Sequence, residues 1–202
     1  MSLEKCVNIV VCGTGGQGNV LLSRFLARAF VRKGYYATIG ETFGMSQRGG
    51  AVMSHVRIAR EKPYGPLIPE GQGHVILSLE PMETIRVLGD YGNPSIAVIS
   101  NVRPVHPVIS ITGEADYPDL AEVKRVIREM SGKTWFLDAT QISLEMGNTL
   151  LTNMVMIGAL AESKVVDLTE SDLKDIIRES FSGDIAQTNI SAVSRGMRAV
   201  RG

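Results

Sequence analysis

The sequence contains little cysteine, few aromatic residues and no excess of charge of either sign. Its 202 residues include two cysteines and 5% aromatic residues, and 21 Lys and Arg balance 21 Asp and Glu. A chain without net charge has no overall electrostatic attraction to nucleic acid or to an anionic membrane, so we expect neither as a partner. Two thiols are also too few to hold an iron–sulfur cluster on this chain alone.

Long hydrophobic runs are absent as well. No stretch approaches the roughly 18 uncharged apolar residues of a membrane span. Residues 1–5 pass directly into a strand-like run, so we expect no signal peptide. Cys6 and Cys12 share one predicted strand and cannot link distant parts of a fold, which indicates reduced thiols and a cytoplasmic protein.

The usual motifs of catalysis and metal binding are missing too. His55, His74 and His106 are scattered without metal-ligand spacing, and no Walker, Gly-x-Ser-x-Gly or His-Glu-x-x-His motif occurs. Gly89 and Asp90 are not followed by the asparagine pair of a thiamine-diphosphate site. We therefore predict no metal site and no catalytic residue on this chain.

What is present is an alternation of apolar strands and amphipathic helices. Residues 7–12 form a buried-strand run, the apolar positions of 22–30 recur at helical spacing up to Gly34, and residues 36–39 form a second strand. This β-α-β pattern predicts an α/β fold, a three-layer Rossmann-like domain with a largely parallel, mixed sheet. No linker or repeat interrupts residues 1–202, so we predict a single domain.

The rest of the chain continues this pattern. Residues 51–58 alternate, with Met53, His55 and Arg57 on the polar face, as in an antiparallel or edge strand with one wet side. Further predicted elements are strands at 74–79, 95–100 and 133–137, edge structure at 102–113, helices at 81–88, 120–130 and 144–161, a capping box at 169–172 that opens a helix to 181, and a weak helix at 189–200. Small residues near Gly158 would let another helix approach closely.

Parallel strands gather their carboxyl ends at one edge of the sheet, where open α/β sheets bind ligands or partners. The residues predicted at this edge are Gly13–Gly18, Glu41, Glu80, Asn101 and Asp138.

The spacing Gly13-x-Gly15-x-x-Gly18 fits a dinucleotide-binding turn, and Glu41 lies where an acidic residue would hold a ribose hydroxyl. The same glycines also occur in strand-to-helix turns that serve packing alone. Arg48, followed by Gly49 and Gly50, either presents a guanidinium to phosphate, carboxylate or a neighbouring subunit, or is a surface arginine in a turn.

Taken together, these motifs resemble the gamma domain or subunit family of the 2-oxoacid:ferredoxin oxidoreductases. The resemblance is carried by Gly13-Thr-Gly-Gly-Gln-Gly18, by Phe43-Gly-Met-Ser-Gln-Arg-Gly-Gly-Ala51 and by Ser54-His-Val-Arg57, and it extends through Leu79-Glu-Pro81, Tyr117-Pro118 and Asn153-Met154. The second and third motifs are most similar to the beta subunits of the indolepyruvate branch.

The resemblance implies an accessory subunit, inactive alone, of a complex that converts a 2-oxoacid, coenzyme A and oxidised ferredoxin into acyl-coenzyme A, carbon dioxide and reduced ferredoxin. Thiamine diphosphate and iron–sulfur clusters would belong to partner subunits, with coenzyme A as co-substrate and ferredoxin met through the complex. The isolated chain could form a homodimer.

The residues that match the family motifs are Gly15, Gly16, Gln17, Gly18, Arg48, Gly49 and Gly50. We expect them to contact a partner subunit or a phosphate-bearing ligand and not to act in catalysis. The glycine turn and Glu41 leave open an alternative, a stand-alone Rossmann-like nucleotide-binding protein. A third hypothesis, a homo-oligomeric scaffold, is suggested by the apolar segment 150–161.

Overall fold

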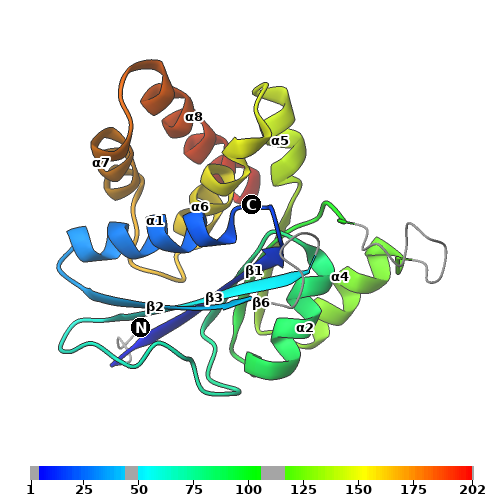
Figure 1. Cartoon of the computed structure of the whole chain (residues 1–202). Helices are drawn as coiled ribbons and strands as arrows, with labels where there is room; N and C mark the ends of the chain where they lie inside the picture. Colours follow the sequence, from blue (N-terminus) through cyan, green and yellow to red (C-terminus); the bar gives the residue numbers. More distant parts are fainter. Residues whose placement is uncertain (1–4, 44–49, 106–116, 202) are drawn as a thin grey trace.

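The computed structural model describes residues 5–43, 50–105 and 117–201 of the chain, which form a mixed sheet covered by helices on both faces (Figure 1). The strands are β1 (Val7–Thr14), β2 (Tyr36–Phe43), β3 (Ala51–Ala59), β4 (Val75–Ser78), β5 (Ala97–Asn101) and β6 (Lys133–Leu137). The helices are α1 (Asn19–Arg32), α2 (Pro81–Tyr91), α4 (Leu120–Glu129), α5 (Ala139–Glu145), the 3-10 turn η1 (Thr149–Leu151), α6 (Thr152–Glu162), α7 (Glu170–Ser180) and α8 (Gly183–Val200).

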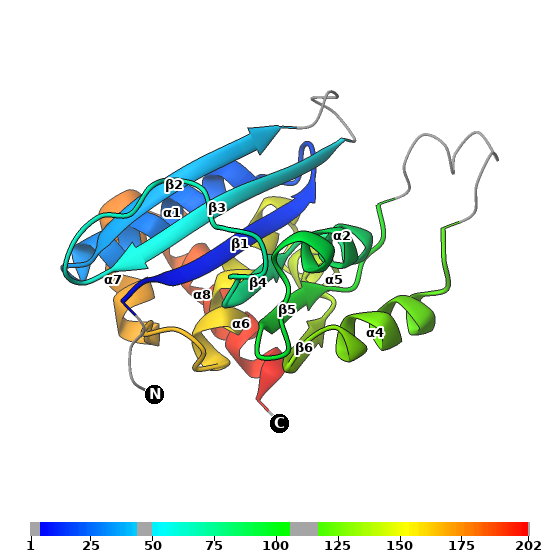
Figure 2. The same ribbon diagram turned by 90° about the horizontal axis from the view of Figure 1, so that it is seen from below.

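The sheet has the strand order β2-β3-β1-β4-β5-β6, and β3 alone runs against the other strands (Figure 2). The predicted α/β fold with a largely parallel, mixed sheet is confirmed. One detail is different: β2 is parallel to β1 in direction but is not its neighbour, because β3 lies between them and pairs antiparallel with both.

Strand β3 corrects the prediction of a wet strand face. It is an interior strand, and its side chains alternate between the two cores, as the sequence pattern indicates. His55 on the predicted polar face is only 1% exposed, because the 60–73 loop covers it and the backbone N–H of Ile68 donates to its Nδ1 (3.3 Å). The ring also meets Tyr91 edge-on. The loop thus buries a side chain whose alternation alone would place it in water.

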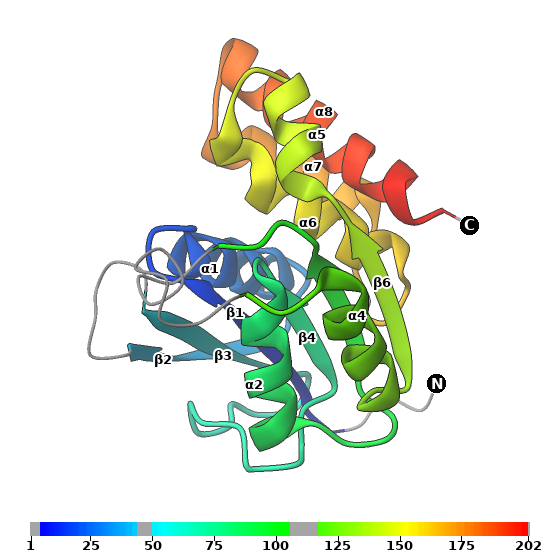
Figure 3. The ribbon, with the colours of Figure 1, turned by 90° about the vertical axis from the view of Figure 1, so that its right-hand side faces the viewer.

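The two faces of the sheet carry separate hydrophobic cores. Figure 3 shows the two groups of helices that lie over these faces. Helices α1 and α5–α8 cover the larger core, and α2 and α4 cover the smaller one. Within the larger layer, α6 and α8 touch backbone to backbone: a Cβ on Gly158 would lie 2.1 Å from Val193 O, and one on Gly196 would lie 1.9 Å from Val155 O. The predicted close approach at Gly158 is confirmed.

The single helix predicted over 144–161 is wrong. Helix α5 ends at Glu145, Gly147 takes the left-handed φ of +78° that ends a helix, and the Asn148 side chain accepts from Leu150 N–H to start η1. Helix α6 then buries Met154 to Ala161 inside the chain. Its apolar surface, which suggested a homo-oligomeric scaffold, is covered intramolecularly.

The C-terminal helices differ from their predictions in one respect. The capping box at Thr169 and Asp172 is confirmed, but α8 begins at Gly183 instead of residue 189 and is a full helix, because it packs along α6 and α7. Residues 102–105 form no strand, and the rest of the predicted edge structure, 106–113, lies outside the described residues. Within the described ranges, no helix is long and apolar enough to cross a membrane.

Candidate functional site at the carboxyl edge of the sheet

The glycine turn joins the end of β1 to the start of α1, as the sequence predicts. Gly16 and Gly18 have φ values of +100° and +86°, a region that side chains with a Cβ rarely adopt. Gly18 is the N-cap of α1 and supplies no side-chain acceptor, so the first-turn N–H groups of the helix lack a side-chain cap. The sharp turn therefore requires glycine at both positions.

The space beside Gly13, the first glycine of the motif, is taken by side chains of the turn and of α1. A Cβ on Gly13 would lie 2.6 Å from Gln17 Oε1 and 2.9 Å from Asn19 Oδ1. Gln17 accepts from Thr14 N–H (2.7 Å) and donates to Leu79 O (3.1 Å). Gln17 thus ties the turn to the end of β4 and has its polar atoms engaged within the protein.

The side chain of Asn153 joins the turn to α6. Asn153 Nδ2 donates to Gly18 O (3.3 Å), and Asn19 Nδ2 donates to Thr14 O (3.3 Å). The Oδ1 atoms of both asparagines are buried and accept no hydrogen bond from the residues that the structure describes. Sequence reasoning assigned Asn153 no contact, since only the fold brings residues 135 positions apart together.

The glycine turn and the Arg-Gly-Gly segment are far apart in the sequence but adjacent in the structure. Gly15 N–H donates to Gly50 O (2.8 Å), so the end of the Arg-Gly-Gly segment lies against the glycine turn. The predicted site residues Arg48 and Gly49 lie outside the described residues. The structure therefore brings Gly15, Gly16, Gln17, Gly18 and Gly50 together at the carboxyl edge of β1.

Glu41 is placed away from this cluster. It lies within β2, one strand beyond β3, and successive strands are about 4.8 Å apart. Its carboxylate pairs with Arg24 on α1 (3.4 Å). Because β3 separates β2 from β1, Glu41 does not lie on the strand next to the glycine turn, where the acidic residue of a dinucleotide site holds the ribose.

A buried carboxylate that sequence reasoning left without a role is central to the neighbouring part of the edge. Glu80 is 1% exposed and accepts from Glu83 N–H (2.9 Å), Tyr117 O–H (2.6 Å) and Val105 N–H (3.4 Å). Its side chain caps α2 and anchors the chain at both 105 and 117. Burial raises the pKa of nearby Glu83, against the opposing effect of its ion pair with Arg86.

The other two predicted edge residues also serve the backbone. Asn101 is fully buried; it donates to Leu79 O (3.1 Å) and Thr140 Oγ1 (3.0 Å) and accepts from Ala139 N–H (3.0 Å). Asp138 accepts from Gln141 N–H and caps α5. These groups hold the edge in shape and are not directed at a ligand.

Histidine and cysteine chemistry is spread through the fold. His55 is buried under the 60–73 loop, His74 accepts from Asn8 N–H at the opposite edge, and His106 lies outside the described residues. Burial raises the pKa of the Cys12 thiol to about 12. Among the described residues, no group of three His, Cys, Asp or Glu side chains could hold a metal ion.

Exposed leucines flank the glycine turn. Leu21, 70% exposed, follows Gly18 on α1, while Leu150, 81% exposed, precedes Asn153, which bonds to Gly18 O. Leu144 on the adjoining α5 is 50% exposed. Apolar side chains gathered beside a turn with uncapped helix N–H groups suit contact with another protein surface better than acid–base chemistry.

Comparisons with known proteins identify the family and the fold. The family model for pyruvate ferredoxin/flavodoxin oxidoreductase matches residues 8–199. Indolepyruvate oxidoreductase subunit IorB of Thermococcus kodakarensis is 40% identical over 98% of this chain and 97% of its own. The pyruvate/ketoisovalerate oxidoreductases common subunit gamma of that organism is 28% identical over 89% of each chain. The solved 2-oxoglutarate:ferredoxin oxidoreductase of Magnetococcus marinus shares the fold (TM-score 0.75, 23% identity), with 98% of this chain matching 32% of that one.

Proposed function

Because this chain belongs to the pyruvate ferredoxin/flavodoxin oxidoreductase family, we propose that it is the accessory subunit of a thiamine-diphosphate-dependent 2-oxoacid:ferredoxin oxidoreductase. The complex would decarboxylate a 2-oxoacid, transfer the acyl group to coenzyme A and pass two electrons to ferredoxin. The observation that carries this proposal is the 40% identity to an indolepyruvate oxidoreductase subunit over almost the whole of both chains. The chain would form a single gamma-type domain over residues 1–202.

The substrate class within the family is inferred from how similar this chain is to subunits named for different 2-oxoacids. Subunits named for indolepyruvate are 33–40% identical to this chain, whereas the common gamma subunits named for pyruvate and ketoisovalerate are 27–28% identical. A gamma subunit named for phenylglyoxylate, another aryl 2-oxoacid, is 30% identical. This ordering favours an indolepyruvate or other aryl 2-oxoacid as the substrate of the complex.

The residues of this chain do not fit the redox cofactors. Cys6 and Cys12 are buried in the core, and burial raises the pKa of both thiols, whereas a cluster ligand must be a thiolate. Gln17 closes the glycine turn with its own amide. We therefore assign thiamine diphosphate and the clusters to partner subunits and no catalytic residue to this chain.

We propose that the partner docks on the carboxyl edge. The docking surface would comprise Gly15, Gly16, Gly18 and Gly50, the adjoining Arg48 and Gly49, and the exposed Leu21, Leu144 and Leu150. Gln17 supports this surface from inside. Glu41 takes no part because Arg24 holds its carboxylate on the α1 side.

The first test is anaerobic affinity purification of the tagged chain from its native cells, with mass spectrometry and an iron count. We expect a larger partner that carries iron and thiamine diphosphate. Recovery of the chain alone, without iron, would contradict the proposal and favour the nucleotide-binding alternative, which calorimetry with NAD, NADP and FAD would then test.

The docking surface has its own test. Leu150→Glu and Arg48→Ala should each weaken copurification of the partner without lowering the melting temperature. Leu67→Glu is the matched control, since Leu67 is 59% exposed in the loop that covers His55, away from the glycine turn. Equal partner recovery with all three variants would remove this surface from the proposal.

A further inference from the structure

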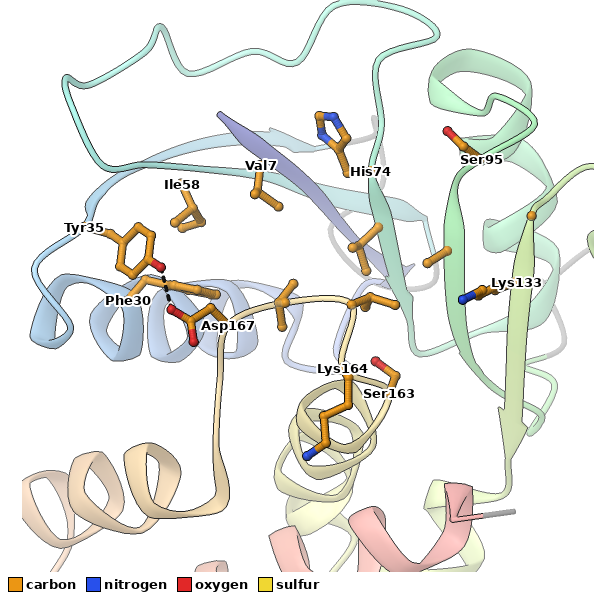
Figure 4. A pocket seen from close by; sticks show the side chains of 15 residues that line it. Val7, Phe30, Tyr35, Ile58, His74, Ser95, Lys133, Ser163, Lys164 and Asp167 are labelled. Atoms are coloured by element: carbon orange, nitrogen blue, oxygen red, sulfur yellow. Dashed lines mark hydrogen bonds between the residues drawn. The ribbon is translucent and has the colours of Figure 1, made fainter. Parts of the chain in front are cut away.

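A cleft of about 770 Å³ lies at the opposite edge of the sheet from the glycine turn (Figure 4). Its walls include the first residues of β1, β4, β5 and β6 and residues 163–167, which follow α6. Because β1 runs from Val7 in the cleft to Thr14 at the turn, the two sites are separated by about 23 Å, seven residues at 3.3 Å each. Nothing in the proposed partner contact uses this cleft.

The cleft has the size and the lining of a small-molecule site. Such sites enclose about 300–1,000 Å³ and combine an apolar wall with a few polar groups. Here the apolar wall comes from Val7, Ile58 and Val75 on three strands and from Val165 and Val166 on the facing segment. This wall would accommodate an aromatic ring or a branched chain.

The charges around the wall favour an anion. Asp167 is the one acidic residue among the lining residues that the structure describes. Its carboxylate is ion-paired with Lys33 (3.1 Å) and Arg60 (3.3 Å) and accepts a hydrogen bond from the Tyr35 hydroxyl (2.6 Å). Two lysines also line the cleft, and neither forms an ion pair with the part of the chain that the structure describes. Lys133 is the first residue of β6, and Figure 4 shows its side chain among those that line the cleft.

Lys164 is the second cation that lines the cleft, and its backbone adopts a strained left-handed conformation. It is the one residue other than glycine with a positive φ among the described residues (+59°), a conformation that costs an L-residue about 1 kcal/mol. Its side chain extends along α6 in Figure 4, where its charge acts on the Glu162 carboxylate, and its four-carbon stem would have to rotate to bring the ammonium to the opening. Glycine would fit this position with less strain than lysine.

We propose that this cleft, at the opposite edge of the sheet from the glycine turn, binds a small organic carboxylate with an apolar body, aryl or branched. The carboxylate would meet Lys133 and, secondarily, Lys164, while the ring or branched chain packs on Val7, Ile58 and Val75. No bond is made or broken. The site would let the accessory subunit sense the concentration of a substrate-like acid.

Calorimetry on the full chain tests this with phenylacetate as the probe. Phenylacetamide, which has the same shape without the charge, and inorganic phosphate, which has charge without an apolar body, should bind at least about tenfold more weakly, since both the charge-assisted contact and the apolar wall contribute. Phenylacetamide binding as tightly as phenylacetate, or no phenylacetate binding at 10 mM (roughly −2.7 kcal/mol), would overturn the proposal.

Variants locate the site. Lys133→Gln should weaken phenylacetate binding about tenfold and Lys164→Gly about threefold, magnitudes typical of losing one charge-assisted hydrogen bond fully or in part. Lys164→Gly should also raise the melting temperature, which would show that its weaker binding does not come from unfolding. Lys62→Gln, another lysine without an ion pair but outside the cleft, is the matched control.

Equal affinity in all three variants would place the probe elsewhere and overturn the assignment. The outcome is independent of the partner experiments: the cleft can fail while the chain still copurifies with its partner, and the docking surface can fail while phenylacetate still binds.

Discussion

The turn at Gly18 gives a stability prediction whose size can be worked from the structure. An alanine there must adopt the left-handed φ of +86°, which costs about 1–2 kcal/mol. Its Cβ would also lie 2.6 Å from Asn153 Nδ2, so the amide must move away and lose its hydrogen bond to Gly18 O, worth about 1 kcal/mol. Gly18→Ala should therefore destabilise the protein by about 2–3 kcal/mol.

Gly16→Ala is the matched control. Gly16 has a similar φ of +100°, but a Cβ there would meet no atom within 4 Å, so only the backbone cost applies. We expect Gly18→Ala to melt about 3 °C below Gly16→Ala, since about 1 kcal/mol shifts the melting temperature by roughly 2–4 °C in a chain of this length. Thermal unfolding followed by circular dichroism measures both.

A double-mutant cycle then isolates the contact. In the Asn153→Ala background the amide is gone, and Gly18→Ala should cost no more than Gly16→Ala does in the unmodified chain. If Gly18→Ala and Gly16→Ala melt together, or if removing Asn153 leaves their difference intact, the assignment of Asn153 as the joint between α6 and the turn is wrong.

Three further predictions follow from the packing and the titrations. Gly196→Ala should destabilise by more than about 3 kcal/mol in urea unfolding, because the new Cβ on α8 would lie 1.9 Å from Val155 O in the backbone of α6, and neither helix can yield locally; a cost like that of Gly16→Ala would contradict it. Cys6 and Cys12 should resist Ellman's reagent at pH 8 in the native state and react after unfolding, because burial raises both thiol pKa values; fast native reaction would refute this. The hydrogen bond from Tyr35 lowers the pKa of Asp167, so its stabilisation is present above the unfolded pKa near 3.9 and is lost as the pH falls. Tyr35→Phe should thus cost about 0.5–1 kcal/mol at pH 7, a value kept small by the 42% exposure of Asp167, and less at pH 3; an equal cost at both pH values would contradict it.

Local signals were sufficient wherever the chain interacts with itself over short distances. The structures of the buried strand β1, of the glycine turn and of the capping box at Thr169 can each be predicted from a few neighbouring residues, and each is observed. The alternating pattern of β3 correctly predicts which side chains share a face. The strand's neighbours depend on long-range pairing, so its position between β2 and β1 could not be read from the pattern.

The predictions failed where a segment distant in sequence determines the structure, or where a helix-ending signal in the sequence was given too little weight. His55 alternates as a wet residue would, but the 60–73 loop covers it. The break between α5 and α6 had a local signal, since Gly147 followed by Asn148 is a typical helix end and new start, but the apolar residues on both sides outweighed it. The start of α8 rests on packing against α6 and has only a weak local signal.

The same distinction applies to the glycine motif. Its spacing suggests a ligand, yet the structure gives each feature an internal reason: Gly13 makes room for the Gln17 amide, Gly18 takes the left-handed turn, and Asn153 ties that turn to α6. A turn held in this way on three sides is rigid without a nucleotide. Because α1 then begins at a fixed place with uncapped N–H groups beside exposed leucines, the motif is better suited to presenting a preformed surface to a partner than to closing around a cofactor.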